Sequence, residues 1–295
     1  MAATQDEMTW LIVGAGGQLG RSIQEMLKTR NIAFQPLTHE ELDITDLFQV
    51  RESVKNSCAE VIVNAAAYTN VEQAEVESTK AFSVNETGAR NLAIAAREQD
   101  SKFIHFSTDY VFSGLRNLPW NITDQVKPLS VYGKSKLAGE IAVMNEYSGN
   151  SLIIRTSWLY SPFGKNFYKT ILNLALNSND PISVVNDQFG QPTNAEDLSN
   201  LLFSAIENQV SSGIYHGSNS GVATWHDFAV EIFTLAGADV ARVKKINSNE
   251  YKTKAARPDY SVLNNSKWSE FGVKALDPWR ESARRAFPTI YESLS

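Results

Sequence analysis

The sequence predicts an α/β fold in which a doubly wound parallel sheet is followed by a smaller, mixed α/β C-terminal domain. Two observations lead to this prediction. Short apolar runs alternate with longer segments of helical periodicity, and the first apolar run stops at a cluster of glycines. Because parallel strands need crossover connections, this alternation is typical of a parallel sheet with helices on both faces.

Each element follows from its apolar pattern, taken in chain order. The expected strands are 10–13, 32–37, 61–63, 103–107 and 152–156, and the expected helices are 21–29, 47–57, 81–98 and 135–144. No Pro-rich linker or repeat divides the chain. We therefore expect a Rossmann domain at 1–155 and a mainly separate substrate domain at 156–295, with part of 181–210 returning to the Rossmann sheet.

Composition excludes several classes of protein. The chain has 295 residues, 43% of them hydrophobic, and a formal net charge of -6, which is unlike the basic surface of a nucleic-acid binder. Cys58 is the single cysteine, and the four histidines show no zinc-site spacing. The polar start of the chain and the short apolar run at 10–13 do not fit a signal peptide or a membrane span. We expect a cytoplasmic protein that binds neither nucleic acid nor membrane.

Three glycines directly after the first expected strand form a GxxGxxG motif, Gly14, Gly17 and Gly20. Glycine permits a turn with positive φ, which we expect at Gly17, and lets a pyrophosphate approach backbone N–H groups at the start of a helix. A glycine-rich turn without a ligand is the alternative. The strand before the motif and the amphipathic helix after it favour a dinucleotide phosphate.

The end of the second expected strand bears on the choice of cofactor. An acidic side chain at this place usually binds the 2′-hydroxyl of NAD, whereas this chain has Thr38 and His39 there. The absence of an acid leaves room for a 2′-phosphate, so the sequence favours NADPH, with NADH possible. Asp43 lies just beyond and either contacts the adenine or caps a helix that starts near Thr45.

Tyr132 and Lys136 give the strongest catalytic signal, because a spacing of four residues places both on one face at a helix start. A free phenol has a pKa of about 10, and we expect the neighbouring ammonium to lower the pKa of Tyr132. An accidental pair on a helix surface is the alternative. Ser107 and Thr108 argue for catalysis, because they end the upstream strand at the ligand-binding edge and can polarise a carbonyl. Asp109 either binds a sugar hydroxyl or forms a turn.

Together these residues resemble the extended short-chain dehydrogenase/reductase family and, within it, the dTDP-4-dehydrorhamnose reductases. The similarity spans nearly the whole chain, and its last two motifs separate this subfamily from generic epimerases. The motifs are Gly17-Gln-Leu-Gly20, Leu42-Asp-Ile-Thr45, Asn64-Ala-Ala-Ala-Tyr-Thr69, Ser107-Thr-Asp-Tyr-Val-Phe112, Pro128 to Glu140, Arg155-Thr-Ser-Trp158 and Asp187 to Thr193.

The resemblance implies reduction of dTDP-4-dehydro-L-rhamnose by NAD(P)H, for the synthesis of rhamnose-containing surface polysaccharide, with the catalytic triad Thr108, Tyr132 and Lys136. It also implies two sets of binding residues. The cofactor set is Gly14, Gly17, Gln18, Leu19, Gly20, Asp43, Ile44, Ala65, Ala66, Tyr132 and Lys136. The sugar-nucleotide set is Thr108, Asp109, Val111, Tyr132, Trp158, Asn166 and Arg257.

Some of these roles have alternatives. Trp158 either stacks on the sugar or is a buried aromatic, and Arg257 binds a phosphate or forms a surface ion pair. Some relatives form a magnesium-linked dimer through a glutamate after the glycine loop, but this chain has Ser22 there, so we expect no metal and a monomer or weak homodimer. The alternative functions are a sugar-nucleotide epimerase or dehydratase, and a non-catalytic regulatory subunit that resembles the β subunit of methionine adenosyltransferase.

Overall fold

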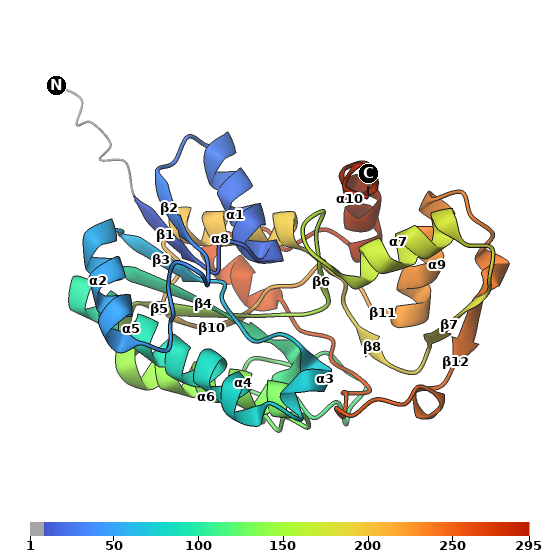
Figure 1. Ribbon diagram of the computed structural model, residues 1–295, viewed down its shortest axis with the longest axis horizontal. Coiled ribbons are helices and arrows are strands. Elements are labelled where there is room, and N and C mark those ends of the chain that lie inside the picture. Colours follow the sequence, from blue (N-terminus) through green and yellow to red (C-terminus); the bar gives the residue numbers. More distant parts are fainter. Residues whose placement is uncertain (1–8, 295) are drawn as a thin grey trace.

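A six-stranded parallel sheet forms the centre of the protein in the computed structural model, which describes residues 9–294 (Figure 1). The strand order is β2-β1-β3-β4-β5-β10, and every neighbouring pair is parallel. Because β2 and β3 lie on opposite sides of β1, the carboxyl ends of β1 and β3 flank a switch point where such sheets bind ligands. The strands are β1 (Trp10–Val13), β2 (Phe34–Leu37), β3 (Val61–Asn64), β4 (Lys102–Thr108), β5 (Ser151–Thr156) and β10 (Gly213–His216).

Helices cover both faces of this sheet and bury its apolar side chains. One core lies between the sheet and the helices α1 (Gln18–Thr29) and α8 (Ala195–Glu207). A second core lies on the other face, under α2 (Leu47–Ser57), α5 (Ala89–Gln99) and α6 (Val131–Tyr147). This arrangement confirms the predicted doubly wound α/β fold. No helix among residues 9–294 is long and apolar enough to cross a membrane.

A smaller α/β unit lies beside the sheet and has its own core (Figure 1). Three two-stranded ladders run through it: β6 with β9, β7 with β12 and, antiparallel, β8 with β11. Its elements are β6 (Leu159–Tyr160), α7 (Phe167–Asn177), β7 (Ile182–Val185), β8 (Phe189–Gly190), β9 (Thr193–Asn194), β11 (Ala223–Thr224), α9 (Trp225–Leu235), β12 (Val243–Ile246) and α10 (Trp279–Glu292).

The second half of the chain also contributes to the sheet layer. Helix α8 falls within the expected range 181–210 and packs against α1, whereas β10, the strand that joins the sheet beside β5, begins after that range. Returning segments therefore extend further along the chain than we expected. The domain bounds 1–155 and 156–295 stay predictions.

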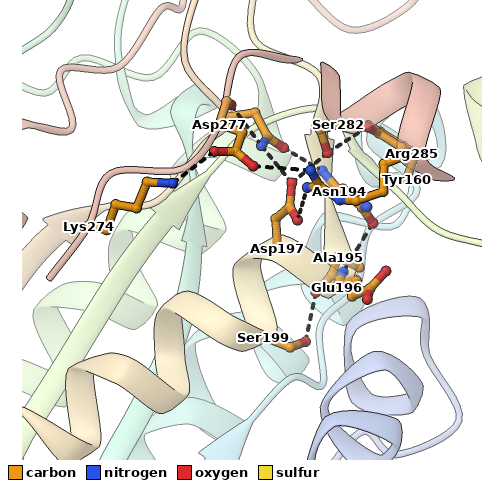
Figure 2. Close-up of polar contacts among 11 residues, drawn as sticks. Tyr160, Asn194, Ala195, Glu196, Asp197, Ser199, Lys274, Asp277, Ser282 and Arg285 are labelled. Carbon is orange, nitrogen blue, oxygen red and sulfur yellow. Dashed lines mark hydrogen bonds and ion pairs between the residues drawn. The ribbon is translucent and has the colours of Figure 1, made fainter. Parts of the chain in front are cut away.

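A buried carboxylate connects helix α8 to helix α10 of the smaller unit. Asp197 accepts hydrogen bonds from Ser282 Oγ and from Arg285 Nη2, both at 2.5 Å (Figure 2). Asn219 Nδ2 donates to the same carboxylate at 2.8 Å, and Arg285 also pairs with Asp277 at 3.0 Å. Because a carboxylate removed from water needs several donors, these contacts hold α10 in place on α8.

The predicted helix at 81–98 is helical throughout, but part of it is not an α-helix. The chain forms α3 (Val71–Ala74) and α4 (Ser78–Phe82), then a π-helical segment, Ser83–Gly88, before α5. The wide segment presses Asn85 against α6: a Cβ on Gly139 would lie 2.2 Å from Asn85 O. The Asn85 amide also donates to Ser135 Oγ at 2.9 Å. The π-helical geometry thus accompanies a contact with a segment that is distant in sequence.

Candidate active site

A cavity of about 590 Å³ opens beside the carboxyl ends of the sheet strands and includes residues of the smaller unit in its wall. A hollow of about 690 Å³ at the opposite edge, where β3 and β4 begin, includes none of the predicted site residues. The first cavity brings together the predicted residues Gly17, Gln18, Leu19, Ala65, Thr108, Asp109, Tyr132, Lys136, Trp158 and Asn166. Residues predicted to bind the cofactor, to catalyse the reaction and to bind the sugar nucleotide therefore line the same cavity.

The glycine loop leaves the start of α1 free to bind an anion. Gly17 is the N-cap of α1, no side chain caps this helix, and its first turn contains no acidic residue. The first N–H groups of α1 consequently lack side-chain acceptors, and the helix dipole favours a negative group there. These features fit the pyrophosphate of a dinucleotide.

The three glycines of the loop have different tasks. Gly14 has a φ of 81°, whereas Gly17 has a φ of -77°, so the positive φ expected at Gly17 is wrong. A Cβ on Gly14 would lie 2.4 Å from Ala66 N, and a Cβ on Gly20 would lie 2.3 Å from Gly14 O. Gly14, Gly20 and Ala66 therefore pack the loop on the sheet, and Gly17 lines the cavity.

Asp43 and Ile44 lie outside the cavity lining. Asp43 Oδ1 accepts hydrogen bonds from Thr45 N at 2.9 Å and from Thr45 Oγ1 at 2.7 Å. Helix α2 begins only at Leu47 and has Asp46 as its N-cap, so a cap by Asp43 is wrong. Ile44 is buried in the core under α2. Contact of both residues with the adenine stays a prediction.

Tyr132 and Lys136 occupy the first two turns of α6, beside Thr108 at the end of β4. The buried Lys136 ammonium donates to Phe106 O at 2.6 Å. Burial raises the pKa of Tyr132 to about 12, although nearby Thr108 favours the phenolate in part. The expected lowering of this pKa by Lys136 is wrong, because desolvation outweighs other effects. Tyr132 is therefore protonated at neutral pH, as a proton donor must be.

A buried ionic network lies next to this pair. Glu140, one turn after Lys136, accepts two hydrogen bonds from Arg155, at 2.8 and 2.7 Å, and one from Ser107 Oγ. Both charged side chains are at most 3% exposed. Burial lowers the pKa of Lys136 to about 8, and the Glu140 charge acts in the opposite direction. Sequence reasoning assigned Glu140 no role, although its spacing from Tyr132 and Lys136 was a usable signal.

Asp109 lies in the cavity lining, but Val111 does not. Asp109 Oδ1 accepts a hydrogen bond from Thr108 Oγ1 at 3.0 Å, and Oδ2 has no partner among residues 9–294. Burial raises the pKa of Asp109 to about 7. Val111 is fully buried against Phe112 and Trp120, so its side chain does not face the cavity.

Of the other predicted substrate residues, Trp158 and Asn166 line the cavity, whereas Arg257 forms an ion pair outside it. Trp158 is partly exposed in the cavity wall and stacks on Trp225. Asn166 lines the cavity and caps α7. Arg257 lies outside the lining and pairs with Glu72 at 2.9 Å, while its buried Nε has no partner among residues 9–294. Arg257 thus forms an ion pair, and its contact with a nucleotide phosphate stays a prediction.

Comparison with known proteins decides the family. The model of the RmlD substrate binding domain matches residues 8–291. A dTDP-4-dehydrorhamnose reductase of Streptomyces griseus is 40% identical over 285 residues, covering 95% of this chain and 93% of the relative. The chain belongs to the dTDP-4-dehydrorhamnose reductase family. This confirms the resemblance found in the motifs.

Two further members of this similarity group bear on cofactor and sugar. The crystal structure of dTDP-4-dehydrorhamnose reductase from Bacillus anthracis, in complex with NADP, matches with a TM-score of 0.92 and 37% identity, covering 96% of this chain and 99% of that one. A dTDP-4-keto-6-deoxy-D-glucose reductase of Streptomyces niveus is 37% identical over 281 residues, covering 95% and 97%. These two relatives of the chain are thus named after different sugar nucleotides.

Proposed function

We propose that this chain reduces the 4-keto group of dTDP-4-dehydro-L-rhamnose with NADPH and forms dTDP-L-rhamnose for surface polysaccharide. The observation that carries the proposal is the grouping of Thr108, Tyr132 and Lys136 in one cavity with the uncapped start of α1. The Streptomyces griseus and Bacillus anthracis relatives support the substrate and the phosphorylated cofactor through their names and bound NADP. NADH remains the second cofactor to test.

Bound NADPH supplies a hydride, and the chain supplies the proton and the polarisation. Tyr132, protonated at neutral pH, donates a proton to the carbonyl oxygen as negative charge develops there. Thr108 can hydrogen-bond to the same oxygen when its hydroxyl no longer donates to Asp109. A pKa of about 7 means that Asp109 is partly neutral near neutral pH, which permits this exchange.

Lys136 holds the cofactor side of the site. An ammonium has three donors, and one of them is used by Phe106 O. The remaining donors suit ribose hydroxyls, so Lys136 both binds the cofactor and keeps a positive charge near Tyr132.

The finer parts of the proposal concern location and assembly. The single cysteine supports a reducing cytoplasm, and Ser22 at the place of the magnesium-linking glutamate supports a monomer or weak homodimer. The second candidate substrate is dTDP-4-keto-6-deoxy-D-glucose, which the Streptomyces niveus relative favours.

One assay tests the proposal directly. Oxidation of NADPH and of NADH is followed with each 4-keto sugar nucleotide, and the product is identified by NMR. We expect dTDP-L-rhamnose with NADPH as the better donor. No substrate-dependent oxidation with either cofactor would contradict the proposal. Tightly bound NAD in the purified protein would instead favour an epimerase or dehydratase, and capture of a methionine adenosyltransferase without reductase activity would favour a regulatory subunit.

A further inference from the structure

Two tryptophans that are distant in sequence form one stacked pair in the cavity wall. The ring centroids of Trp158 and Trp225 lie 3.6 Å apart, and the ring planes differ by 8°. Both side chains line the cavity that includes Thr108 and Tyr132. Phe167, at the start of α7, contacts Trp225 from another side with a centroid distance of 4.7 Å.

Trp158 has a backbone conformation that bulky residues rarely adopt. Its φ is 43°, in the left-handed region, and it follows directly after the end of β5 and Ser157. Such a conformation persists only where surrounding contacts fix it, and it is often found at ligand sites. The position of the indole is therefore imposed by its neighbours.

The ladder of β8 with β11 supplies these neighbours. It pairs Gly190 with Ala223, and Trp225 follows β11 as the first residue of α9. A Cβ on Gly190 would lie 2.5 Å from Trp158 Cε2, so only glycine lets the ladder approach the indole this closely. The Thr224 side chain and Asp227 form a capping box that fixes the start of α9 and hence Trp225.

The indole pair lies next to the reacting groups. Thr108 and Thr156 are paired in the register of β4 and β5, and Trp158 is two residues beyond Thr156. If Thr108 and Tyr132 act on the sugar carbonyl, the sugar half of the substrate occupies the space beside Trp158. The Trp158 indole also carries an N–H group in the cavity wall, which can donate to a sugar hydroxyl.

We propose that Trp225 is a positioning residue that stacks on Trp158 and holds its indole as a rigid wall for the sugar half of the sugar nucleotide. This inference rests on the proposed function. It assigns Trp225 to recognition of the sugar, and the nucleotide half is bound elsewhere. Loss of the stack should therefore weaken binding of dTDP-L-rhamnose and leave binding of dTDP unchanged.

The experiment compares two ligands and one spectroscopic signal. Trp225→Leu and Trp225→Phe are titrated with dTDP-L-rhamnose and with dTDP, each at saturating NADP⁺. We expect Trp225→Leu to raise the Kd of dTDP-L-rhamnose about 3- to 10-fold, the size expected for one aromatic pair, with dTDP within about 2-fold. Trp225→Phe should be intermediate. The exciton couplet of the stacked indoles in far-ultraviolet circular dichroism should disappear in both variants.

Phe189→Leu is the matched control, because Phe189 belongs to the same ladder but its ring faces Tyr260, with a centroid distance of 6.2 Å. It should keep the couplet and both Kd values. An unchanged Kd for dTDP-L-rhamnose in Trp225→Leu, or an equal loss for dTDP, would overturn the inference. If Trp225→Leu does not fold, an unchanged Kd in Trp225→Phe overturns it.

Failure of the proposed function gives a different pattern. Wild-type protein that binds dTDP-L-rhamnose but does not oxidise NADPH with the 4-keto sugars overturns the function alone. Wild-type protein that does not bind dTDP-L-rhamnose, or that lacks the couplet, overturns the role of the indole pair.

Discussion

The side-chain amide of Asn166 donates a hydrogen bond to Gln18 Oε1 at 2.9 Å and so joins the N-cap of α7 to the glycine loop. Ser161 Oγ donates to the same oxygen at 3.2 Å. One turn along α1, the Arg21 guanidinium lies 4.1 Å from the ring centroid of Phe163. The predicted cofactor loop therefore contacts the segment that leads to the predicted sugar site.

We predict that Gln18 and Asn166 act as a coupled pair. Gln18→Ala and Asn166→Ser should each weaken sugar-nucleotide binding, and the double variant should lose less than the sum, with a coupling of about 0.5 to 1.5 kcal/mol. Serine keeps a good N-cap on α7. Titrations of dTDP-L-rhamnose at saturating NADP⁺ give the binding free energies of this double-mutant cycle. Strictly additive losses of binding free energy would show that the contact carries no binding energy.

Tyr132→Phe should lower kcat at least about 100-fold, because the ring remains but the proton donor is lost. The ring packs edge-on against Tyr110, with a centroid distance of 5.7 Å, and this contact needs no hydroxyl. The Kd of NADPH should stay within about 2-fold of wild type. Steady-state kinetics and cofactor titration check both values; normal turnover would remove Tyr132 from the mechanism.

Cofactor affinity should depend on pH through Lys136. Because burial lowers the pKa of Lys136 to about 8, its ammonium is charged below that pH and is progressively lost above it. The Kd of NADPH should be constant near neutral pH and then rise, by at most about tenfold per pH unit, above pH 8. Lys136→Arg should flatten this rise because arginine stays charged.

The matched variant Lys136→Ala should weaken cofactor binding at every pH and also slow turnover. An unchanged Kd in this variant, or the same alkaline rise in Lys136→Arg, would exclude Lys136 as the titrating group.

Two glycine substitutions should separate cofactor binding from stability. Gly17→Val should abolish cofactor binding with a nearly normal Tm, because φ at Gly17 is -77° and the new side chain enters the cavity. Gly20→Ala should instead lower Tm, since its Cβ would lie 2.3 Å from Gly14 O. Thermal melting and cofactor titration on the same samples check this; a lowered Tm with normal affinity in Gly17→Val would refute the phosphate site.

Removal of either partner of the buried pair Glu140–Arg155 should strongly destabilise the protein. Glu140→Leu or Arg155→Met leaves one charge buried without its counter-ion, which typically costs about 3 to 5 kcal/mol. The double variant should be more stable than the sum of both losses predicts. Urea unfolding of the wild type and the three variants measures their free energies of unfolding. Additive losses in this free energy would contradict a strongly coupled pair.

The local apolar pattern was sufficient to predict most strands of the sheet and several of its helices. The strand Trp10–Val13 and the helix Leu47–Ser57 lie where the apolar pattern predicts them, because each buries a face that the pattern itself defines. The segment Ser83–Gly88 was not predictable in this way. Its π-helical geometry accompanies the contact of Asn85 O with Gly139, and a local sequence carries no signal for so distant a partner.

The sequence by itself determined the doubly wound sheet and the family, because periodicity and short motifs are local properties, and the resemblance implied the triad Thr108, Tyr132 and Lys136. Only the tertiary structure decided the protonation of Tyr132, since its pKa depends on burial. It likewise decided the contacts of Trp158 with Trp225, because they belong to segments that meet only when the smaller unit packs beside the sheet. Spatial proximity, which sequence spacing does not encode, set the electrostatics and the walls of the site.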